Sequence, residues 1–334
     1  MQYVTLGSTG VQVSELCFGT MTFGREADEE TSAAMFRRCR GAGINFFDCA
    51  NVYADGRSEN ILGGLIEDCR DELVITSKVG MGGGVEPNER GLSRGHIMEQ
   101  VELSLGRLGT DRLDVYFCHC EDPRTPMEET LRAMDDLVRQ GKVRYAGVSN
   151  WPAWTIARAL GMAERLGLNR LHVLQPMYSL AKRTAEVEIL PLAHDENLGV
   201  ISYSPLGGGL LTGKYTGGEQ PENGRLTWHE GYAKRYGYPT YRDVADGFAA
   251  YAEEAGVDPV TLAVAWVKSH PAITAPIIGA RNPEQLEPSL AAAEYEMSTD
   301  QWREISDLTP PVPVATDRDE EREQQYRWVL EEMD

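Results

Sequence analysis

Short runs of apolar residues alternate along the chain with longer segments in which apolar residues recur every three or four positions. The first pattern is typical of strands buried on both faces, and the second of helices with one buried face. Eight strands are expected in this way: Leu16–Gly19, Asn45–Asp48, Leu73–Lys78, Leu113–Phe117, Val143–Val148, Val173–Gln175, Val200–Tyr203 and Ala275–Gly279. Eight strands, each followed by a helix, predict an α/β fold whose parallel sheet closes into a (β/α)8 TIM barrel.

The helical pattern is clearest in six segments between the strands. They are residues 29–39, 59–69, 97–108, 127–138, 154–166 and 187–194. Ser93 is placed to cap the third of these helices, and Gly141 to close the fourth. No G-x-G-x-x-G motif follows an early strand, so the strongest expected sign of an open Rossmann sheet is missing.

Three segments interrupt the repeating pattern of what we expect to be a single domain over residues 1–334. Residues 1–13 predict a hairpin that turns at residues 7–10. Residues 206–242 form a loop after the seventh strand that is too long for a simple turn and rich in aromatic residues, as lids and binding loops often are. Residues 310–334 form an acidic tail with a short helix expected around residues 326–330. The tail either folds across the barrel mouth or docks elsewhere.

Composition excludes several classes of protein. The 32 basic residues face 52 acidic ones, which gives a formal net charge of −20. Nucleic acids and anionic membranes need a basic footprint, so neither is an expected partner. The six cysteines include no C-x-x-C pair and no zinc-like spacing with histidine, which favours reduced thiols and no bound metal. Without a signal-like or membrane-spanning segment, we expect a cytoplasmic protein, monomeric or homo-oligomeric.

Polar side chains stand at the carboxyl end of nearly every predicted strand. They are Asp48, Lys78, His119, Ser149, Asn150, Gln175, Tyr203, Ser204 and the segment 279–281. In a TIM barrel these ends converge on one mouth, where the active site lies. Burying so many polar groups without partners would be costly, so the pattern predicts one functional cluster.

In the same segments the chain resembles the aldo-keto reductases. The matching stretches are residues 45–53, 76–78, 114–119, 147–150, 203–206 and 278–281. Each stretch alone is weak, but their order and spacing together are specific. In detail they look closer to bacterial members that act on small carbonyl compounds or sugars than to steroid reductases.

The resemblance implies a catalytic tetrad of Asp48, Tyr53, Lys78 and His119. Carbonyl reduction needs a proton for the developing alkoxide, and a phenol is a poor acid near neutrality. A neighbouring lysine is expected to lower the pKa of Tyr53, and Asp48 to hold that lysine. His119 is expected to orient the substrate oxygen. Taken singly, each residue also fits a structural role, as a buried ion pair or as packing; four suitable types at successive strand ends favour catalysis.

The resemblance also implies NADPH, with NADH as a second option. Ser149, Asn150 and Gln175 would hold the carboxamide, and Tyr203 would stack on the nicotinamide. Ser204, Leu206 and Lys214 would line the pyrophosphate, Arg281 would grip the 2′-phosphate, and Gln285 would reach the adenine. The remaining expected cofactor contacts are Gly19, Thr20, Met21, Pro205, Gly209, Gly279 and Ser289. Ser289 follows Pro288 and stands where relatives often have Asn.

The expected function is NADPH-dependent reduction of an aldehyde, ketone or sugar carbonyl to the alcohol, with Tyr53 as general acid. The alternative is a nucleotide-binding, redox-sensing regulatory subunit with little turnover. A metal-dependent lyase or isomerase is disfavoured because His119 alone among the six histidines sits at a convincing strand end. Substrate choice would depend on Gly80–Gly95, Trp151 and the aromatics of 228–241, which either cover the ligands or pack on the exterior.

Overall fold

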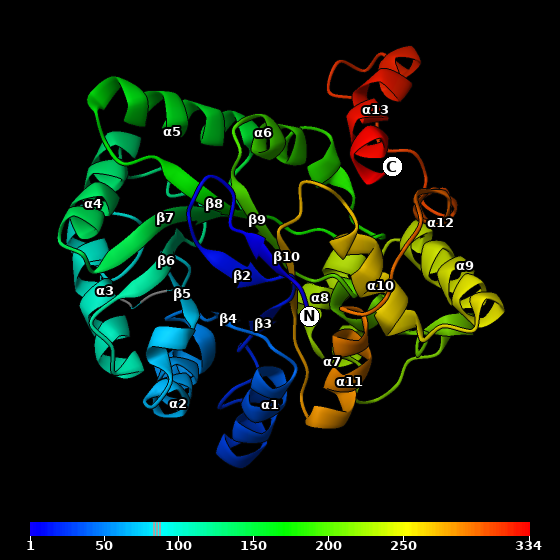
Figure 1. The fold of residues 1–334 in the computed structure, drawn as a ribbon, viewed down its shortest axis with the longest axis horizontal. Coiled ribbons are helices and arrows are strands. Elements are labelled where there is room, and N and C mark those ends of the chain that lie inside the picture. The colour runs from blue at the N-terminus through cyan, green and yellow to red at the C-terminus, as the bar shows by residue number, and fades with distance from the viewer. Residues whose placement is uncertain (83, 85, 87) are drawn as a thin grey trace.

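Parallel strands close into a barrel in the computed structural model of the protein, with neighbours in the order β10-β3-β4-β5-β6-β7-β8-β9 (Figure 1). The structure describes residues 1–82, 84, 86 and 88–334, without the side chains of residues 325 and 326. The strands are β3 (Cys17–Gly19), β4 (Phe46–Asp48), β5 (Val74–Val79), β6 (Leu113–Cys118), β7 (Val143–Ser149), β8 (Leu171–Gln175), β9 (Gly199–Ser202) and β10 (Ala275–Ile278). The predicted barrel is confirmed, and each predicted strand is present within two residues of its expected bounds.

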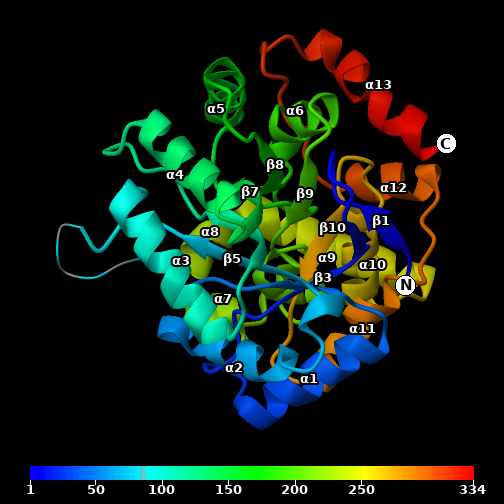
Figure 2. The ribbon, with the colours of Figure 1, turned by 60° about the vertical axis from the view of Figure 1, so that its left-hand side comes forward.

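Helices surround the barrel and return the chain to the amino ends of the strands (Figures 1 and 2). Those that follow strands are α1 (Glu29–Gly41), α2 (Arg57–Ile66), α3 (Arg94–Leu108), α4 (Met127–Arg139), α5 (Ala153–Leu166), α6 (Ile189–Asp195), α10 (Pro259–Lys268) and α11 (Pro283–Ala291). Ser93 caps α3 as predicted, since its hydroxyl accepts a hydrogen bond from the His96 amide. The six predicted helices are all present.

An N-terminal hairpin closes the amino end of the barrel. Strands β1 (Tyr3–Thr5) and β2 (Gln12–Ser14) pair antiparallel, as predicted. Leu6 and Val13 of this hairpin pack against the apolar side chains inside the barrel. The turn approaches β9 so closely that a Cβ on Gly7 would lie 2.2 Å from the Gly199 nitrogen. The hairpin therefore leaves the opposite, carboxyl end as the open mouth.

The long connection after β9 is folded, where the sequence predicted a loop. It contains the 3₁₀ turns η4 (Gly207–Thr212) and η5 (Thr216–Gly218), then α7 (Arg225–Trp228), α8 (Glu230–Tyr236) and α9 (Pro239–Ala255). Helices of four and seven residues are too short to show a helical repeat in sequence. They are held by tertiary packing, including the buried ring of Tyr236.

The C-terminal tail docks on the amino end of the barrel, away from the mouth (Figure 2). It follows α12 (Thr299–Ser306) and contains η6 (Asp319–Glu321) and α13 (Arg322–Met333). Trp328 stacks on His194 at the end of α6, with ring centroids 4.3 Å apart, and lies edge-on to His270 after α10. Of the two positions left open by the sequence, the one across the mouth is wrong. None of the helices in the described parts of the chain is both long and apolar enough to cross a bilayer.

Candidate active site

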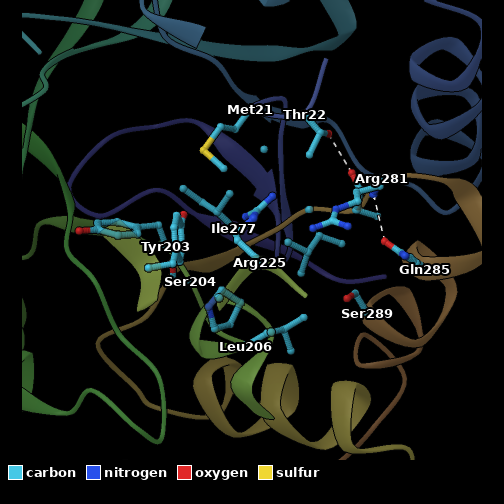
Figure 3. A pocket seen from close by; sticks show the side chains of 18 of the residues that line it. Met21, Thr22, Tyr203, Ser204, Leu206, Arg225, Ile277, Arg281, Gln285 and Ser289 are labelled. Atoms are coloured by element: carbon cyan, nitrogen blue, oxygen red, sulfur yellow. Dashed lines mark hydrogen bonds between the residues drawn. The ribbon is translucent and has the colours of Figure 1, made fainter. Parts of the chain in front are cut away.

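A cavity of about 690 Å³ opens at the carboxyl ends of the strands (Figure 3). Its size is typical of small-molecule and cofactor sites. The sequence-predicted residues that line it are Gly19, Met21, Asp48, Tyr53, His119, Ser149, Asn150, Gln175, Tyr203, Ser204, Pro205, Leu206, Gly209, Lys214, Gly279, Arg281, Gln285 and Ser289. Two others do not line it. Lys78 lies directly behind Tyr53, and Thr20 is fully buried with its hydroxyl donating to the Asp48 carbonyl at 3.0 Å.

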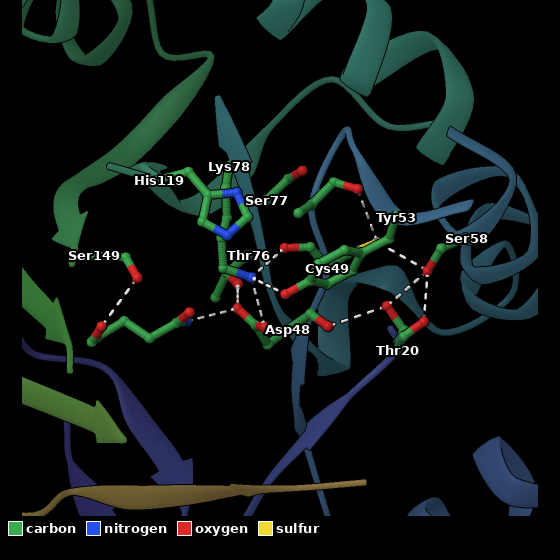
Figure 4. A network of polar contacts seen from close by, with 12 residues as sticks. Thr20, Asp48, Cys49, Tyr53, Ser58, Thr76, Ser77, Lys78, His119 and Ser149 are labelled. Carbon is green, nitrogen blue, oxygen red and sulfur yellow. Dashed lines mark hydrogen bonds and ion pairs between the residues drawn. The ribbon is translucent and has the colours of Figure 1, made fainter. Parts of the chain in front are cut away.

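Lys78 is the centre of a buried polar network (Figure 4). Its ammonium donates to Asp48 Oδ2 at 2.6 Å, to the Cys49 carbonyl at 2.7 Å and to the Tyr53 hydroxyl at 3.2 Å. An ammonium has three protons, and all three are used here. Because the Tyr53 oxygen accepts from Lys78, the phenolic proton itself remains available on the cavity side.

Asp48 is held by donors on both carboxylate oxygens. Its Oδ1 accepts from the Thr76 hydroxyl at 2.7 Å and from Gln175 Nε2 at 2.9 Å. The parallel register brings the Thr76 hydroxyl to the Asp48 carboxylate, since Asp48 pairs with Thr76 across β4 and β5. This arrangement compensates a carboxylate and an ammonium that would each be costly to bury alone.

The backbone around the cavity contains several residues in the left-handed region. Ala54 and Asp55, directly after Tyr53, have φ of +49° and +56°. Asn150 and Ser204, at the ends of β7 and β9, have φ of +60° and +61°. Such conformations cost roughly 1–3 kcal/mol each in non-glycine residues and persist where the surrounding structure imposes them. They concentrate here at the mouth, where they set the directions of the lining side chains.

His119 follows β6 and faces Tyr53, with ring centroids 6.2 Å apart. Burial, and then the nearby charge of Lys78, lowers the pKa of His119 to about 3. The imidazole is therefore neutral at physiological pH and carries one donor and one acceptor. Its Nδ1 is buried without a hydrogen-bond partner in the described part of the chain.

Burial dominates the ionisation of Tyr53. It raises the pKa of Tyr53 to about 12, and the opposing charge of Lys78 offsets only part of that effect. The sequence predicted that Lys78 would lower the pKa of Tyr53. That direction was wrong, because burial outweighs the lysine charge. Burial also lowers the pKa of Lys78, but Asp48 and Tyr53 raise it more, and the net pKa lies above its ordinary value. The site therefore holds a protonated phenol beside a permanent cation.

The side chains expected to hold a carboxamide already bond to one another. Asn150 Nδ2 donates to the His119 carbonyl and to the Ser149 hydroxyl, and the Ser149 hydroxyl donates to the Gln175 carbonyl. The Tyr203 hydroxyl donates to Asn150 Oδ1 at 2.6 Å. What remains available here is mainly acceptor capacity, including Gln175 Oε1, which suits an NH₂ group.

Lys214, Arg225 and Arg281 line the cavity, and Arg281 lies at the end opposite Tyr203 (Figure 3). Partial burial lowers the pKa of Lys214, and the charges of Arg281 and Arg225 lower it further. Arg281 donates to the Asn223 carbonyl at 2.9 Å, and Arg225 lies 3.6 Å from Glu26. Gly209 has φ of +98°, and a Cβ at this position would lie 3.0 Å from Lys214 Nζ. A glycine here therefore leaves room for the lysine side chain. The buried hydroxyl of Ser289 has no partner in the described chain. Clustered cations and an orphaned donor fit a phosphorylated nucleotide.

Sequence reasoning missed several lining residues from the folded connection after β9. They include Thr212, Pro221, Asn223, Gly224, Arg225 and Arg235. The basic character of Arg225 and Arg235 was the available signal, but their places depend on short helices that the sequence does not reveal. Tyr232 shows that this segment does reach the ligand cavity, whereas Trp228 and Tyr238 are exposed. Met81 also lines the cavity, Trp151 is buried outside it, and positions 83, 85 and 87 of the predicted flanking loop lie outside the described residues.

No cluster of three or more histidine, cysteine, aspartate or glutamate side chains is arranged to hold a metal ion in the parts of the chain that the structure describes. The cysteines are free thiols: Cys17, Cys39, Cys49, Cys69, Cys118 and Cys120.

The profile of the Aldo/keto reductase family matches residues 15–309. The chain belongs to the aldo-keto reductase family. Among its relatives, the uncharacterized oxidoreductase YrpG of Bacillus subtilis is 38% identical over 323 residues, covering 93% of this chain and 96% of the relative. A probable voltage-gated potassium channel subunit beta of Arabidopsis thaliana is 40% identical over 302 residues, covering 88% and 92%. A putative subunit of the same kind from Schizosaccharomyces pombe is 37% identical over 318 residues, covering 92% and 90%.

Membership confirms the resemblance seen in the strand-end segments. Aldo-keto reductases are oxidoreductases that generally bind NADP(H) and act on small carbonyl compounds. The relatives differ in the roles that their names give them, since one is called an oxidoreductase and the others channel subunits. The choice between those roles for this aldo-keto reductase depends on its own residues.

Proposed function

We propose that the protein reduces an aldehyde, ketone or sugar carbonyl to the alcohol with NADPH, and that Tyr53 is the general acid. The observation that carries this proposal is the hydrogen bond from Lys78 to the Tyr53 oxygen, which leaves the phenolic proton free at the cavity. The experiment is steady-state NADPH oxidation with a panel of aldehydes, ketones and open-chain sugars. Turnover of at least one class is expected.

Bound NADPH would supply the hydride, and this chain's residues would supply orientation and the proton. The neutral imidazole of His119 donates a hydrogen bond to the substrate oxygen and orients it. As negative charge develops on that oxygen, Tyr53 donates its proton. The phenolate left behind is stabilised by the ammonium of Lys78 at 3.2 Å, which Asp48 keeps charged.

The cofactor would occupy the length of the cavity. Ser149, Asn150 and Gln175 would hold its carboxamide, Tyr203 would stack on the nicotinamide, and Ser204, Leu206 and Lys214 would line the pyrophosphate. Gln285 and Ser289 stand at the adenine end, where the orphaned Ser289 hydroxyl offers a donor. NADH would use the same contacts apart from those to the 2′-phosphate.

We expect Arg281→Ala to remove the preference for NADPH over NADH. Each charge-assisted hydrogen bond to a phosphate is worth roughly 10- to 150-fold in affinity, less where solvent reaches the pair. Fluorescence titration of both cofactors gives the ratio of dissociation constants, with Arg132→Ala on α4 as a control far from the cavity. Equal affinities in the unmodified protein, or an unchanged ratio in Arg281→Ala, would contradict this role.

The second candidate function is a nucleotide-binding regulatory subunit with little turnover. It is favoured by the relatives named as potassium channel beta subunits. The complete set of Asp48, Tyr53, Lys78 and His119 around one cavity favours the enzyme.

Six free thiols fit a reducing compartment, so we propose the cytoplasm as the site of action and a small molecule as the partner.

A further inference from the structure

The ligand cavity is strongly cationic in a protein whose net charge is −20. Lys214, Arg225, Arg235 and Arg281 all line it. In the described chain the one carboxylate that lines it is Asp48, and Lys78 already neutralises that group. The cavity is therefore suited to anionic ligands, and it offers four cations to bind them.

Arg235 stands apart from the other three cations. Burial lowers the pKa of Lys214, and the charges of Arg281 and Arg225 lower it further. These three cations therefore lie near one another, at the proposed phosphate end. Tyr232 contacts both Arg225 and Arg235, since its ring centroid is 5.3 Å from the Arg225 guanidinium and 5.0 Å from that of Arg235. The charge of Arg235 acts on Tyr203, and not on Lys214 as the other two arginines do.

Arg235 and Tyr203 both line the cavity, and the charge of Arg235 reaches the Tyr203 hydroxyl. Burial raises the pKa of Tyr203, and the charge of Arg235 opposes that rise, so the two groups are near each other. The Tyr203 hydroxyl bonds to Asn150, and Asn150 bonds to the carbonyl of His119. The sequence of neighbours from Arg235 through Tyr203 and Asn150 therefore ends at His119, beside the proton donor.

Arg235 is held in place but has no carboxylate partner among the described residues. It is half-buried, and its guanidinium lies over the ring of Tyr232. Tyr232 is itself fixed against η4, since a Cβ on Gly208 would lie 2.6 Å from the tyrosine ring. By contrast, Arg225 faces Glu26, and Arg281 donates to a carbonyl. A partly desolvated guanidinium with five donors and no acid is suited to a bidentate anion.

We propose that Arg235 binds an anionic group of the substrate, so that the preferred substrates are aldehydes or ketones that carry a carboxylate or a phosphate. This inference rests on the proposed carbonyl reduction. Lys214, Arg225 and Arg281 act on one another and match the phosphates of the cofactor, so Arg235 remains for the substrate. Carboxylate and phosphate each present a pair of acceptor oxygens to which a guanidinium can donate two parallel hydrogen bonds.

The test compares charged substrates with neutral counterparts that carry the same reacting aldehyde. The pairs are 4-formylbenzoate with its methyl ester, and glyceraldehyde 3-phosphate with glyceraldehyde, which separate carboxylate from phosphate recognition. We expect kcat/KM to favour the charged member of at least one pair by about 10- to 100-fold, as charge-assisted bonds typically allow. Arg235→Gln should remove that preference through KM, leave the neutral member within about twofold, and leave the NADPH dissociation constant unchanged. Lys234→Gln, on the exposed side of α8, should keep the preference.

Several results would overturn the inference. The unmodified protein could show no preference in either pair, or Arg235→Gln could weaken NADPH binding or depress both members of a pair equally. Calorimetry of 4-formylbenzoate and of glyceraldehyde 3-phosphate with the NADP⁺-loaded protein separates this inference from the proposed reaction, because binding needs no turnover. Binding lost in Arg235→Gln with no reduction of any aldehyde would support the anion site and contradict the enzyme. Absence of binding together with turnover of neutral aldehydes would do the reverse.

Discussion

Replacement of Tyr53 by Phe should reduce the rate of carbonyl reduction by about 10²- to 10⁴-fold, the usual contribution of general acid catalysis. The substitution removes the oxygen that accepts from Lys78 and carries the transferable proton, and leaves the ring in place. NADPH affinity and folding should therefore change little. Single-turnover reduction by prebound NADPH, with cofactor affinity measured in parallel, isolates the chemical step.

A matched control for this substitution is Tyr251→Phe. The Tyr251 hydroxyl bonds to Glu304 on the surface between α9 and α12, away from the cavity. Its loss should leave the single-turnover rate unchanged. If Tyr53→Phe also retained a rate within about threefold of the unmodified protein, Tyr53 would be a packing residue and not the acid.

Breaking the Asp48–Lys78 pair should destabilise the fold more than removing the pair entirely. Lys78→Met leaves the Asp48 carboxylate buried without its cation, and Asp48→Asn leaves the ammonium without its anion. Removing one partner of a buried ion pair costs about 3–5 kcal/mol in the free energy of unfolding, whereas replacing both by neutral groups is often nearly neutral. Urea unfolding of both single variants and the double variant measures this difference.

Activity should not follow stability in that series. All three variants should reduce carbonyls slowly. Lys78→Met and the double variant lack the cation beside Tyr53, and Asp48→Asn lacks the carboxylate that holds that cation and keeps it charged. An additive loss of stability in the double variant would show that the two charges do not compensate each other. Normal turnover in Lys78→Met would remove Lys78 from the catalytic account.

The barrel itself was predictable because its signal is local. Each strand is a short apolar run bounded by polar residues, and the polar end of each run is what lines the mouth, as at Asp48 and Gln175. The connection after β9 was not predictable as a folded segment. Helices such as α7 and α8 are shorter than two helical repeats, and the contact between Tyr232 and Gly208 that fixes them joins residues far apart in sequence.

The candidate site was also predictable only in part, where its residues follow local sequence signals. Residue types at strand ends indicated Asp48, Lys78 and His119, and the family resemblance added Tyr53. Arg225 and Arg235, by contrast, needed the three-dimensional path of the connection. The ionisation of Tyr53 was also beyond sequence reasoning. A neighbouring lysine suggested a lowered pKa, but the extent of burial decides the balance, and burial is known only once the barrel is closed.

The central claim is that this cavity performs hydride transfer and does not merely hold a nucleotide. The most direct measurement is a single turnover with NADPH deuterated at the transferring carbon, prebound and then mixed with excess 4-formylbenzoate or its methyl ester. Hydride transfer should give an alcohol that contains one deuterium for each NADPH oxidised, and almost none from Tyr53→Phe on the same timescale. NADPH that remains bound and unoxidised, with no labelled alcohol across the panel of aldehydes, ketones and sugars, would contradict the enzyme and favour the regulatory subunit.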